Sequence, residues 1–162
     1  MEEVKIGDRR FKMIDGKICI VKFSRLGIEV KSGKFGPIKF HDSLGYNKCE
    51  ILIDGRPTWL FEHRLVWKLA HPDWNLFDTS KDNLIDHINR NRKDNRLENL
   101  HVVNSQQNNW NTDAKGYTLT PSGKYQVRIM VNNLSIYLGT FDTEEKARAS
   151  YLEAKLKYHV IV

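Results

Sequence analysis

Short segments with the character of β-strands fill the first 60 residues. KICIVKF, GIEVK, KCEILID and PTWLFE mix β-branched and aromatic residues, and glycine-containing turns separate them. This pattern is typical of short strands joined by tight turns. Lysines and arginines outnumber acidic residues by eleven to six between residues 1 and 48. The segment is therefore predicted to be a basic β-meander.

The spacing changes at residues 61–70 and again after residue 83. FEHRLVWKLA has apolar residues on one helical face, at Phe61, Leu65, Val66 and Leu69, which predicts a short amphipathic helix. HPDW ends this helix, and a polar loop follows. NLIDHIN and LHVV then predict two strands around the turn-rich loop RNRKDNRLEN. A helix is expected from about residue 105, with Asn104 or Ser105 as its N-cap.

A third pattern begins at Gly116, after a predicted linker at residues 112–116. YTLTPSGKYQVRIMVNNLSIYLGTF predicts three strands, with turns at Pro121-Ser122-Gly123 and at Asn132-Asn133. DTEEKARASYLEAKLKYH predicts a helix capped by Asp142 or Thr143. Its apolar residues are expected to pack on the sheet: Ala147, Ala149, Tyr151, Leu152 and Leu156. The fold class is thus α+β, with a C-terminal three-stranded antiparallel sheet plus helix.

Length, charge and cysteine content narrow the partners and the compartment. The 162 residues suit one domain or two small ones. The net charge of +6 favours a polyanionic partner, nucleic acid first and an anionic membrane surface second. No apolar run is long enough to span a bilayer, and the N-terminus does not resemble a signal peptide. Cys19 and Cys49 form neither a disulfide framework nor a cysteine-based zinc site, so a cytoplasmic location is expected.

Asp86 and His87 stand together in front of a loop that is dense in asparagine. Hydrolysis of a phosphodiester needs an activated water, a Lewis acid on the phosphate and stabilisation of the leaving oxygen. A neutral histidine can take the proton of the water, and carboxylate and amide oxygens suit a hard divalent cation. A further amide can orient the histidine ring. If Asn99 and Asn108 fold back to the pair, this set predicts phosphodiester chemistry.

Four short signatures in this region resemble the HNH nuclease family, whose core is the ββα-metal fold: HRLV (63–66), DH (86–87), ENL (98–100) and NSQQNN (104–109). The likeness covers roughly residues 60–111. It is strongest to phage homing endonucleases in which asparagine replaces the last histidine. The resemblance implies that His87 is the general base, that Asp86 and Asn108 hold one Mg²⁺ or Mn²⁺ ion, and that Asn99 positions His87. Asn108 and the lack of Cys-x-x-Cys pairs set the chain apart from zinc-stabilised relatives.

Other polar and aromatic residues of this region have plainer interpretations. Three asparagines are predicted only to shape turns: Asn89, Asn91 and Asn95. Four cationic residues either belong to a solvated loop or contact phosphate: Arg90, Arg92, Lys93 and Arg96. His63 could approach the site, but it is expected rather to pack or to form a hydrogen bond. The remaining residues are expected to be structural, in the core or at the surface: His71, His101, Trp67 and Trp110.

The segment from about residue 116 to residue 159 is similar to the Apetala-two/ethylene-response-factor domain, which reads DNA through a three-stranded sheet. GKYQVRIMVNN and YLGTFDTEEKA carry the likeness. It implies a DNA-facing set: Thr118, Arg128, Met130, Ser135, Tyr137 and Thr140. Strand alternation adds Gln126 to that face, and Lys124 completes the predicted set. The alternative is a sheet that only packs on the nuclease, and Lys146 and Arg148 are expected to be solvated.

These features predict an HNH nuclease domain with an N-terminal β region at residues 1–111 and an Apetala-two-like DNA-binding domain at residues 112–162. The expected function is a metal-dependent, site-preferring DNA endonuclease of phage homing type. It would act on double-stranded DNA in the cytoplasm of an infected bacterium, as a monomer or weak dimer. Nicking and double-strand cleavage both stay open. The alternatives are a non-catalytic DNA-binding protein that retains the nuclease fold and an RNA-directed binder or nuclease.

Overall fold

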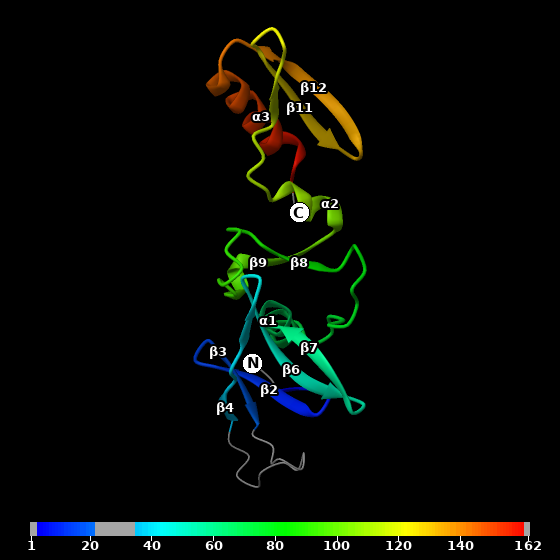
Figure 1. Cartoon of the computed structure of the whole chain (residues 1–162). Helices are drawn as coiled ribbons and strands as arrows, with labels where there is room; N and C mark the ends of the chain where they lie inside the picture. Colours follow the sequence, from blue (N-terminus) through cyan, green and yellow to red (C-terminus); the bar gives the residue numbers. More distant parts are fainter. Residues whose placement is uncertain (1–2, 22–34, 161–162) are drawn as a thin grey trace. The chain divides into compact units, whose positions relative to one another are not determined.

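The computed structural model describes residues 3–21 and 35–160 (Figure 1). The chain divides into two compact units, Met1–Val102 and Val103–Val162. The predicted strand GIEVK, at residues 27–31, lies outside the described residues. The predicted domain boundary between residues 111 and 112 stays a prediction. Within the described ranges, no helix has the length and apolarity needed to cross a membrane.

Two small antiparallel sheets form the N-terminal part of the first unit. One has the strand order β1 (Val4–Ile6), β2 (Arg9–Ile14), β3 (Lys17–Val21) and β4 (Phe35–Pro37). The other has the order β5 (His41–Ser43), β6 (Tyr46–Ile53) and β7 (Arg56–Phe61). Asp-Gly pairs with positive φ at both residues, Asp15-Gly16 and Asp54-Gly55, close two of the hairpins. The mixed α and β class with several antiparallel sheets is confirmed.

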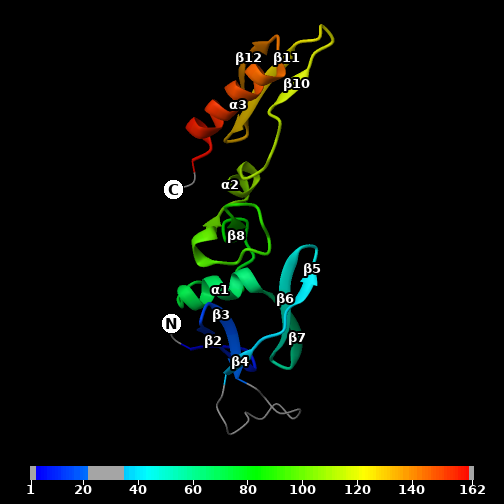
Figure 2. The ribbon, with the colours of Figure 1, turned by 90° about the vertical axis from the view of Figure 1, so that its left-hand side faces the viewer.

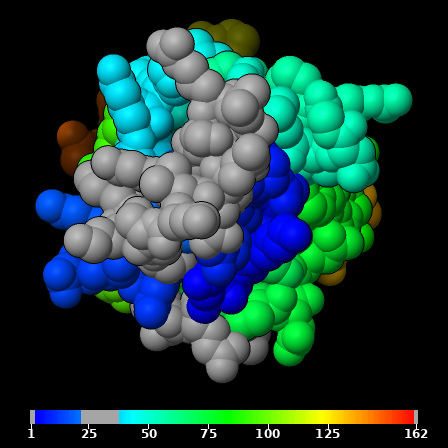
Figure 3. Space-filling model, turned by 90° about the horizontal axis from the view of Figure 1, so that it is seen from below, coloured from blue at the N-terminus to red at the C-terminus, as the bar shows by residue number. Residues whose placement is uncertain are grey.

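Helix α1 (Glu62–Ala70) contributes buried residues to the core of the first unit. Its buried face holds Leu65, Val66 and Leu69, which pack with residues of both sheets such as Phe11 and Ile51. Figure 2 shows α1 beside the β2–β3 ribbon and the β6–β7 hairpin. Seen from below, the blue N-terminal strands lie at the surface of this unit (Figure 3). The predicted amphipathic helix is therefore confirmed. Its packing on the core also positions the start of the loop that follows it.

The loop after α1 is ordered by two polar side chains, in addition to the apolar packing of Leu76 and Trp74 on the core. Arg64 donates from Nε and Nη2 to the carbonyl of Leu76 at 3.2 and 2.6 Å, and Nη2 also reaches the carbonyl of Asp78 at 2.9 Å. The buried Asn83 donates to the carbonyls of Asn75 and Asp78 at 3.0 and 2.8 Å. These bonds satisfy carbonyls that no strand or helix pairs. They also hold the chain that enters β8.

Strand β8 (Leu84–His87) pairs with β9 (Leu100–Val103), and the 3₁₀ turn η1 (Leu97–Asn99) precedes β9. Helix α2 (Ser105–Trp110) follows. Its N-cap is Asn104, whose side chain accepts from the Gln107 amide at 2.8 Å while the Gln107 side chain accepts from the Asn104 amide at 2.9 Å. The predicted order of strand, loop, strand and helix is present along the chain. Its packing as a ββα-metal core stays a prediction.

The second unit contains the β-β-β-α segment. Strands β10 (Tyr117–Leu119), β11 (Tyr125–Val131) and β12 (Leu134–Phe141) form one antiparallel sheet, and α3 (Glu144–Tyr158) lies across one of its faces (Figures 1 and 2). Thr143 caps α3 by accepting from the Lys146 amide at 3.3 Å. The helix buries Ala147, Tyr151 and Ala154 against the sheet.

The face of α3 that meets the sheet differs from the predicted one. Leu152 and Leu156 are 43% and 83% exposed, and Ala149 is exposed as well. Steps of three and four residues from Ala147 lead to Tyr151 and Ala154, whereas Leu152 and Leu156 fall on the other side. The small residue Ala154 lets the helix approach the sheet closely. The assignment of Ala149, Leu152 and Leu156 to the sheet face was wrong.

The predicted linker at residues 112–116 is fastened to α3. Arg148 donates to the carbonyls of Ala114 and Lys115, the latter at 3.1 Å, and pairs with Asp113 at 3.1 Å. Lys155 Nζ donates to the Thr112 carbonyl at 2.7 Å. The interpretation of Arg148 as a solvated helix charge was wrong, because its guanidinium satisfies the carbonyls of an extended segment. This part of the chain is thus folded onto its own unit.

Gly116 makes the closest approach in this arrangement. Its φ is +80°, and a Cβ atom at this position would overlap the ring carbons of Tyr151. Only a residue without a side chain avoids both the backbone strain and the overlap. The glycine therefore sets the distance between the linker and α3.

Replacing Gly116 with alanine is expected to destabilise the second unit by about 4 kcal/mol, the sum of left-handed strain and overpacking. Gly123→Ala is the matched control, because Gly123 has a φ of +77° but a Cβ atom added there would meet nothing within 4 Å. The control should cost about 1–2 kcal/mol of strain alone. Hydrogen exchange of the β10–β12 amides measures both. Equal costs for the two variants would contradict the packing argument.

Candidate active site

Strand β8 points Asp86 and His87 in different directions, as is usual for neighbouring residues of a strand. His87 is 3% exposed. Asp86 approaches His101 of β9, with 3.1 Å between Asp86 Oδ2 and His101 Nε2. His101 was predicted to be structural or at the surface, and it lies beside the predicted metal ligand. The two members of the Asp-His pair therefore have separate surroundings.

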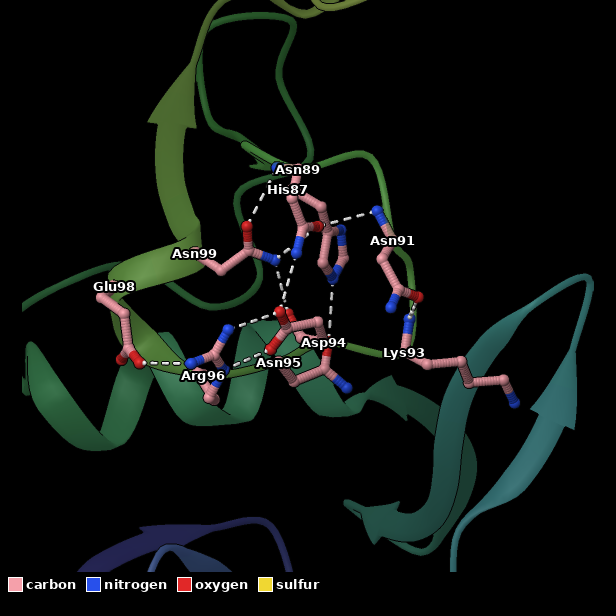
Figure 4. A network of polar contacts seen from close by, with 9 residues as sticks. All are labelled: His87, Asn89, Asn91, Lys93, Asp94, Asn95, Arg96, Glu98 and Asn99. Carbon is pink, nitrogen blue, oxygen red and sulfur yellow. Dashed lines mark hydrogen bonds and ion pairs between the residues drawn. The ribbon is translucent and has the colours of Figure 1, made fainter.

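The loop after β8 is shaped by its own asparagines (Figure 4). Asn89 Oδ1 accepts from the Asn91 amide at 2.8 Å, and Asn91 Oδ1 accepts from the Lys93 amide at 3.1 Å. These are side-chain turns of the kind predicted for Asn89 and Asn91. Arg96 donates twice to Asp94, at 2.8 and 2.9 Å, and these bonds lower the pKa of Asp94 well below its usual range.

Asn99 closes the loop from its other end. Its buried side chain accepts from the Asn89 amide at 2.9 Å and donates to Asn89 Oδ1 at 3.0 Å and to the Asp94 carbonyl at 2.7 Å. The Asn99 carbonyl accepts from the Ile88 amide at 2.9 Å. Asn99 thereby fixes the chain that follows His87. Its assignment as the residue that positions His87 stays a prediction.

A different asparagine meets the His87 ring. Asn95 Oδ1 lies 2.8 Å from His87 Nε2, and Asn95 Nδ2 donates to Glu62 Oε2 at 2.6 Å. The interpretation of Asn95 as only a turn residue was wrong. Nothing in the local sequence separates Asn95 from its neighbours Asn89 and Asn91. Its role depends on Glu62, which the fold brings from the start of α1.

Aromatic rings and a second histidine surround His87. The ring centroid of His63 lies 5.2 Å from that of His87, at 74° between the planes, and Tyr46 lies 5.3 Å from His63 and 6.0 Å from His87. Burial, together with the nearby His87 and Arg64, lowers the pKa of His63 to about 3. His63 packs as predicted, and it also approaches the ring of His87. The lowered pKa favours its neutral form.

Besides Arg96, two further loop cations bind the protein itself. The Arg92 guanidinium lies 4.8 Å from the Tyr46 ring centroid, and Nη1 donates to the Leu44 carbonyl at 3.1 Å. Lys93 Nζ pairs with Asp42 and donates to Asn47 Oδ1 at 3.1 Å. The bond from Lys93 lowers the pKa of Asp42. These contacts attach the loop to the β5–β6 turn. The contact of these cations with phosphate stays a prediction.

The predicted metal ligands lie in different units of the chain. Asp86 belongs to β8 in the first unit, and Asn108 belongs to α2 in the second. Over residues 3–21 and 35–160, no group of three or more His, Cys, Asp or Glu side chains gathers as a metal cage. Mg²⁺ usually keeps several waters and takes one or two carboxylates together with substrate phosphate. The assignment of Asp86 and Asn108 as ligands of Mg²⁺ or Mn²⁺ stays a prediction.

The predicted DNA-facing residues of the second unit share the sheet face opposite α3. Cross-strand pairing aligns Thr118 with Gln126, Gln126 with Thr140, Arg128 with Tyr137, and Met130 with Ser135. The Arg128 guanidinium lies 5.6 Å from the Tyr137 ring centroid, and Tyr137 Oη lies 2.8 Å from Thr140 Oγ1. Lys124, at the edge, pairs with Asp142 at 3.0 Å. The face offers hydrogen-bonding groups, a cation and an exposed aromatic ring.

Comparison with known protein families adds one finding. Residues 61–110 match the family model described as HNH endonuclease. The matched stretch holds α1, the Asp86–His87 pair, the asparagine loop and α2. Neither a search of curated proteins nor a search of solved structures gave a match. The family match supports a nuclease core that acts on DNA.

The neutral state of His63 predicts how stability depends on pH. Its pKa is lowered in the fold from 6.5, so the unfolded chain binds this proton more tightly. The stabilisation is complete above pH 6.5 and is lost as the pH falls towards 3. Through this one group, the free energy of unfolding should fall by about 2 kcal/mol between about pH 7.5 and pH 5. His63→Phe should remove that part of the loss, as measured by urea unfolding at both pH values. An identical pH dependence in the variant would show that His63 is not buried in the neutral form.

Proposed function

We propose that this protein is a divalent-metal-dependent DNA endonuclease that prefers particular sites, of the homing type found in phages. The observation that carries the proposal is the Asp86–His87 pair at the end of β8, inside the stretch that matches HNH endonucleases. The net charge of +6 agrees with a polyanionic substrate. Residues 112–162 would supply a DNA-binding sheet of the Apetala-two type.

In this proposal each polar residue of the central region has one task. His87 takes the proton of the attacking water. Asp86 and Asn108 hold the cation, which when bound polarises the phosphate and stabilises the leaving oxygen. Asn99 keeps the loop after His87 in place through its bonds to Asn89 and Asp94. One centre of this kind cuts one strand, so a monomer would nick and a weak dimer would cut both strands.

The proposed contact surface for DNA is the open face of β10–β12. A small sheet can enter the major groove, where arginine reads guanine and glutamine reads adenine. Arg128 and Gln126 lie on adjacent rungs of this face, with 3.5 Å between Arg128 Nε and Gln126 Oε1. Tyr137 and Met130, both 53% exposed, add apolar surface for the thymine methyl group or sugar. The sheet would select the site and the central region would cut it.

A second candidate is a DNA-binding protein that keeps the nuclease fold without activity. The observation that favours it is the burial of His87, because a general base needs one water at its ring. The contact between Asp86 and His101 also favours this second candidate. The two candidates differ in one result, which is cleavage of plasmid DNA by the wild-type protein with Mg²⁺ or Mn²⁺.

His87→Ala should lower the cleavage rate of supercoiled plasmid by about 100-fold or more and leave DNA affinity unchanged, because only the proton acceptor is removed. EDTA should stop cleavage by the wild type. His41→Ala, which changes an exposed histidine of β5, is the control and should cut normally. Cleavage at the wild-type rate by His87→Ala would refute the assignment of the base. A wild type that binds but never cuts would favour the second candidate.

Arg128→Ala should weaken binding to a preferred DNA site by about 5- to 100-fold, the range for loss of one arginine–base or arginine–phosphate contact. Lys157→Ala is matched in charge and lies exposed on α3. Titrations at several salt concentrations separate the two kinds of contact. A phosphate contact lowers the salt slope by about one, whereas a base contact relaxes specificity. Equal affinities for the two variants would exclude the open sheet face as the DNA contact surface.

A further inference from the structure

A chain of polar contacts runs from the start of α1 to the His87 ring. Glu62 is the first residue of α1, where the helix dipole favours a negative charge. Its Oε2 accepts from Asn95 Nδ2 and from Asn47 Nδ2, both at 2.6 Å. Asn95 Oδ1 then lies 2.8 Å from His87 Nε2. The proposed function gives no task to Glu62 or Asn95.

The chemistry of the two ends fixes the direction of every bond in this chain. A carboxylate can only accept hydrogen bonds, so Asn95 must turn its NH₂ group towards Glu62. The Asn95 carbonyl oxygen then faces His87, and it too can only accept. The proton of a neutral His87 must therefore lie on Nε2, and the lone pair lies on Nδ1. Without an acceptor at residue 62, the Asn95 amide could flip and the imidazole could adopt the other tautomer.

The Glu62 side chain lies beside a cavity. Asn47, Glu62 and Asn95 line this cavity of about 450 Å³ together with Lys93 and apolar residues of β2, β3 and α1. A carboxylate beside such a cavity keeps contact with polar groups and avoids the full cost of burial. Glu62 can therefore serve as the hydrogen-bond acceptor for both asparagines close to the buried histidine.

We propose that Glu62 is a positioning residue for His87, acting through Asn95 to keep the imidazole proton on Nε2 and so present Nδ1 to the attacking water. This inference rests on the proposed function. In the step, the O–H bond of the water breaks and its proton passes to Nδ1. The hydroxide that remains attacks phosphorus, and the leaving oxygen departs with the P–O electrons. The imidazolium keeps its bond from Nε2 to Asn95.

Three variants separate this role from simple support of α1. Glu62→Ala removes the acceptor. Glu62→Gln keeps an oxygen that can accept from both asparagines while removing the charge. Asn47→Ala is the matched control, because it deletes an equal bond to the same carboxylate oxygen but leaves the contact between Asn95 and His87. A fourth variant, Asn95→Leu, interrupts the series of polar contacts between Glu62 and His87 while Glu62 stays in place. It tests the inference if Glu62→Ala does not fold.

The first readout is the tautomer of His87, measured by two-bond ¹H–¹⁵N correlation. The wild type, Glu62→Gln and Asn47→Ala should show the proton on Nε2. Glu62→Ala and Asn95→Leu should lose this preference. The second readout is plasmid cleavage, in which the latter two should lose about 10- to 100-fold in kcat with KM unchanged. Glu62→Gln and Asn47→Ala should stay close to the wild type.

A wild-type His87 with its proton on Nδ1 would overturn the inference, and so would Glu62→Ala or Asn95→Leu with tautomer and kcat unchanged. A drop in Asn47→Ala as large as in Glu62→Ala would also overturn it, by showing that any loss of support around α1 is enough. If the wild type does not cleave DNA at all, the proposed function fails, and the tautomer measurement alone still decides whether Glu62 orders His87.

Discussion

Most buried polar side chains find hydrogen-bond partners, and this tendency shapes the structure between β8 and β9. His87 and Asn99 are both buried there. The loop supplies amide groups at short intervals. Asn99 binds Asn89 and the Asp94 carbonyl, and Asn95 binds His87. The high asparagine content is thus explained by the bonds that the loop makes with itself and with one imidazole.

Local signals in the sequence predicted those elements that depend on neighbouring residues. The Asn104 cap, the turn at Asn132-Asn133 and the alternation along β11 act over a few positions, and all are present in the structure. The same holds for α1, whose apolar stripe is regular. Leu152 and Leu156 show the limit, because α3 is rich in small residues and offers two faces of similar apolarity. In the structure the face that holds Ala147, Tyr151 and Ala154 packs on the sheet.

The candidate site could be predicted only where its polar residues are neighbours in the sequence. Asp86 and His87 are adjacent, so the pair is visible in the sequence. Glu62 and Asn95 are not, because their meeting depends on how α1 is placed against the loop. Arg148 is a similar case: a helix arginine beside glutamates suggests a solvated charge, yet carbonyls of residues 114 and 115 receive its donors. Single-residue interpretation fails when the partner is backbone or is distant in sequence.

The different surroundings of Asp86 and His87 limit how they can act together. Along a strand, the carboxylate and the imidazole face apart, towards His101 on one side and towards His63, Tyr46 and Asn95 on the other. His87 is the last residue of β8, and the chain turns soon after it, with a positive φ at Arg90. A catalytic role for the pair therefore requires a substrate that contacts two separate groups of residues, one around Asp86 and the other around His87.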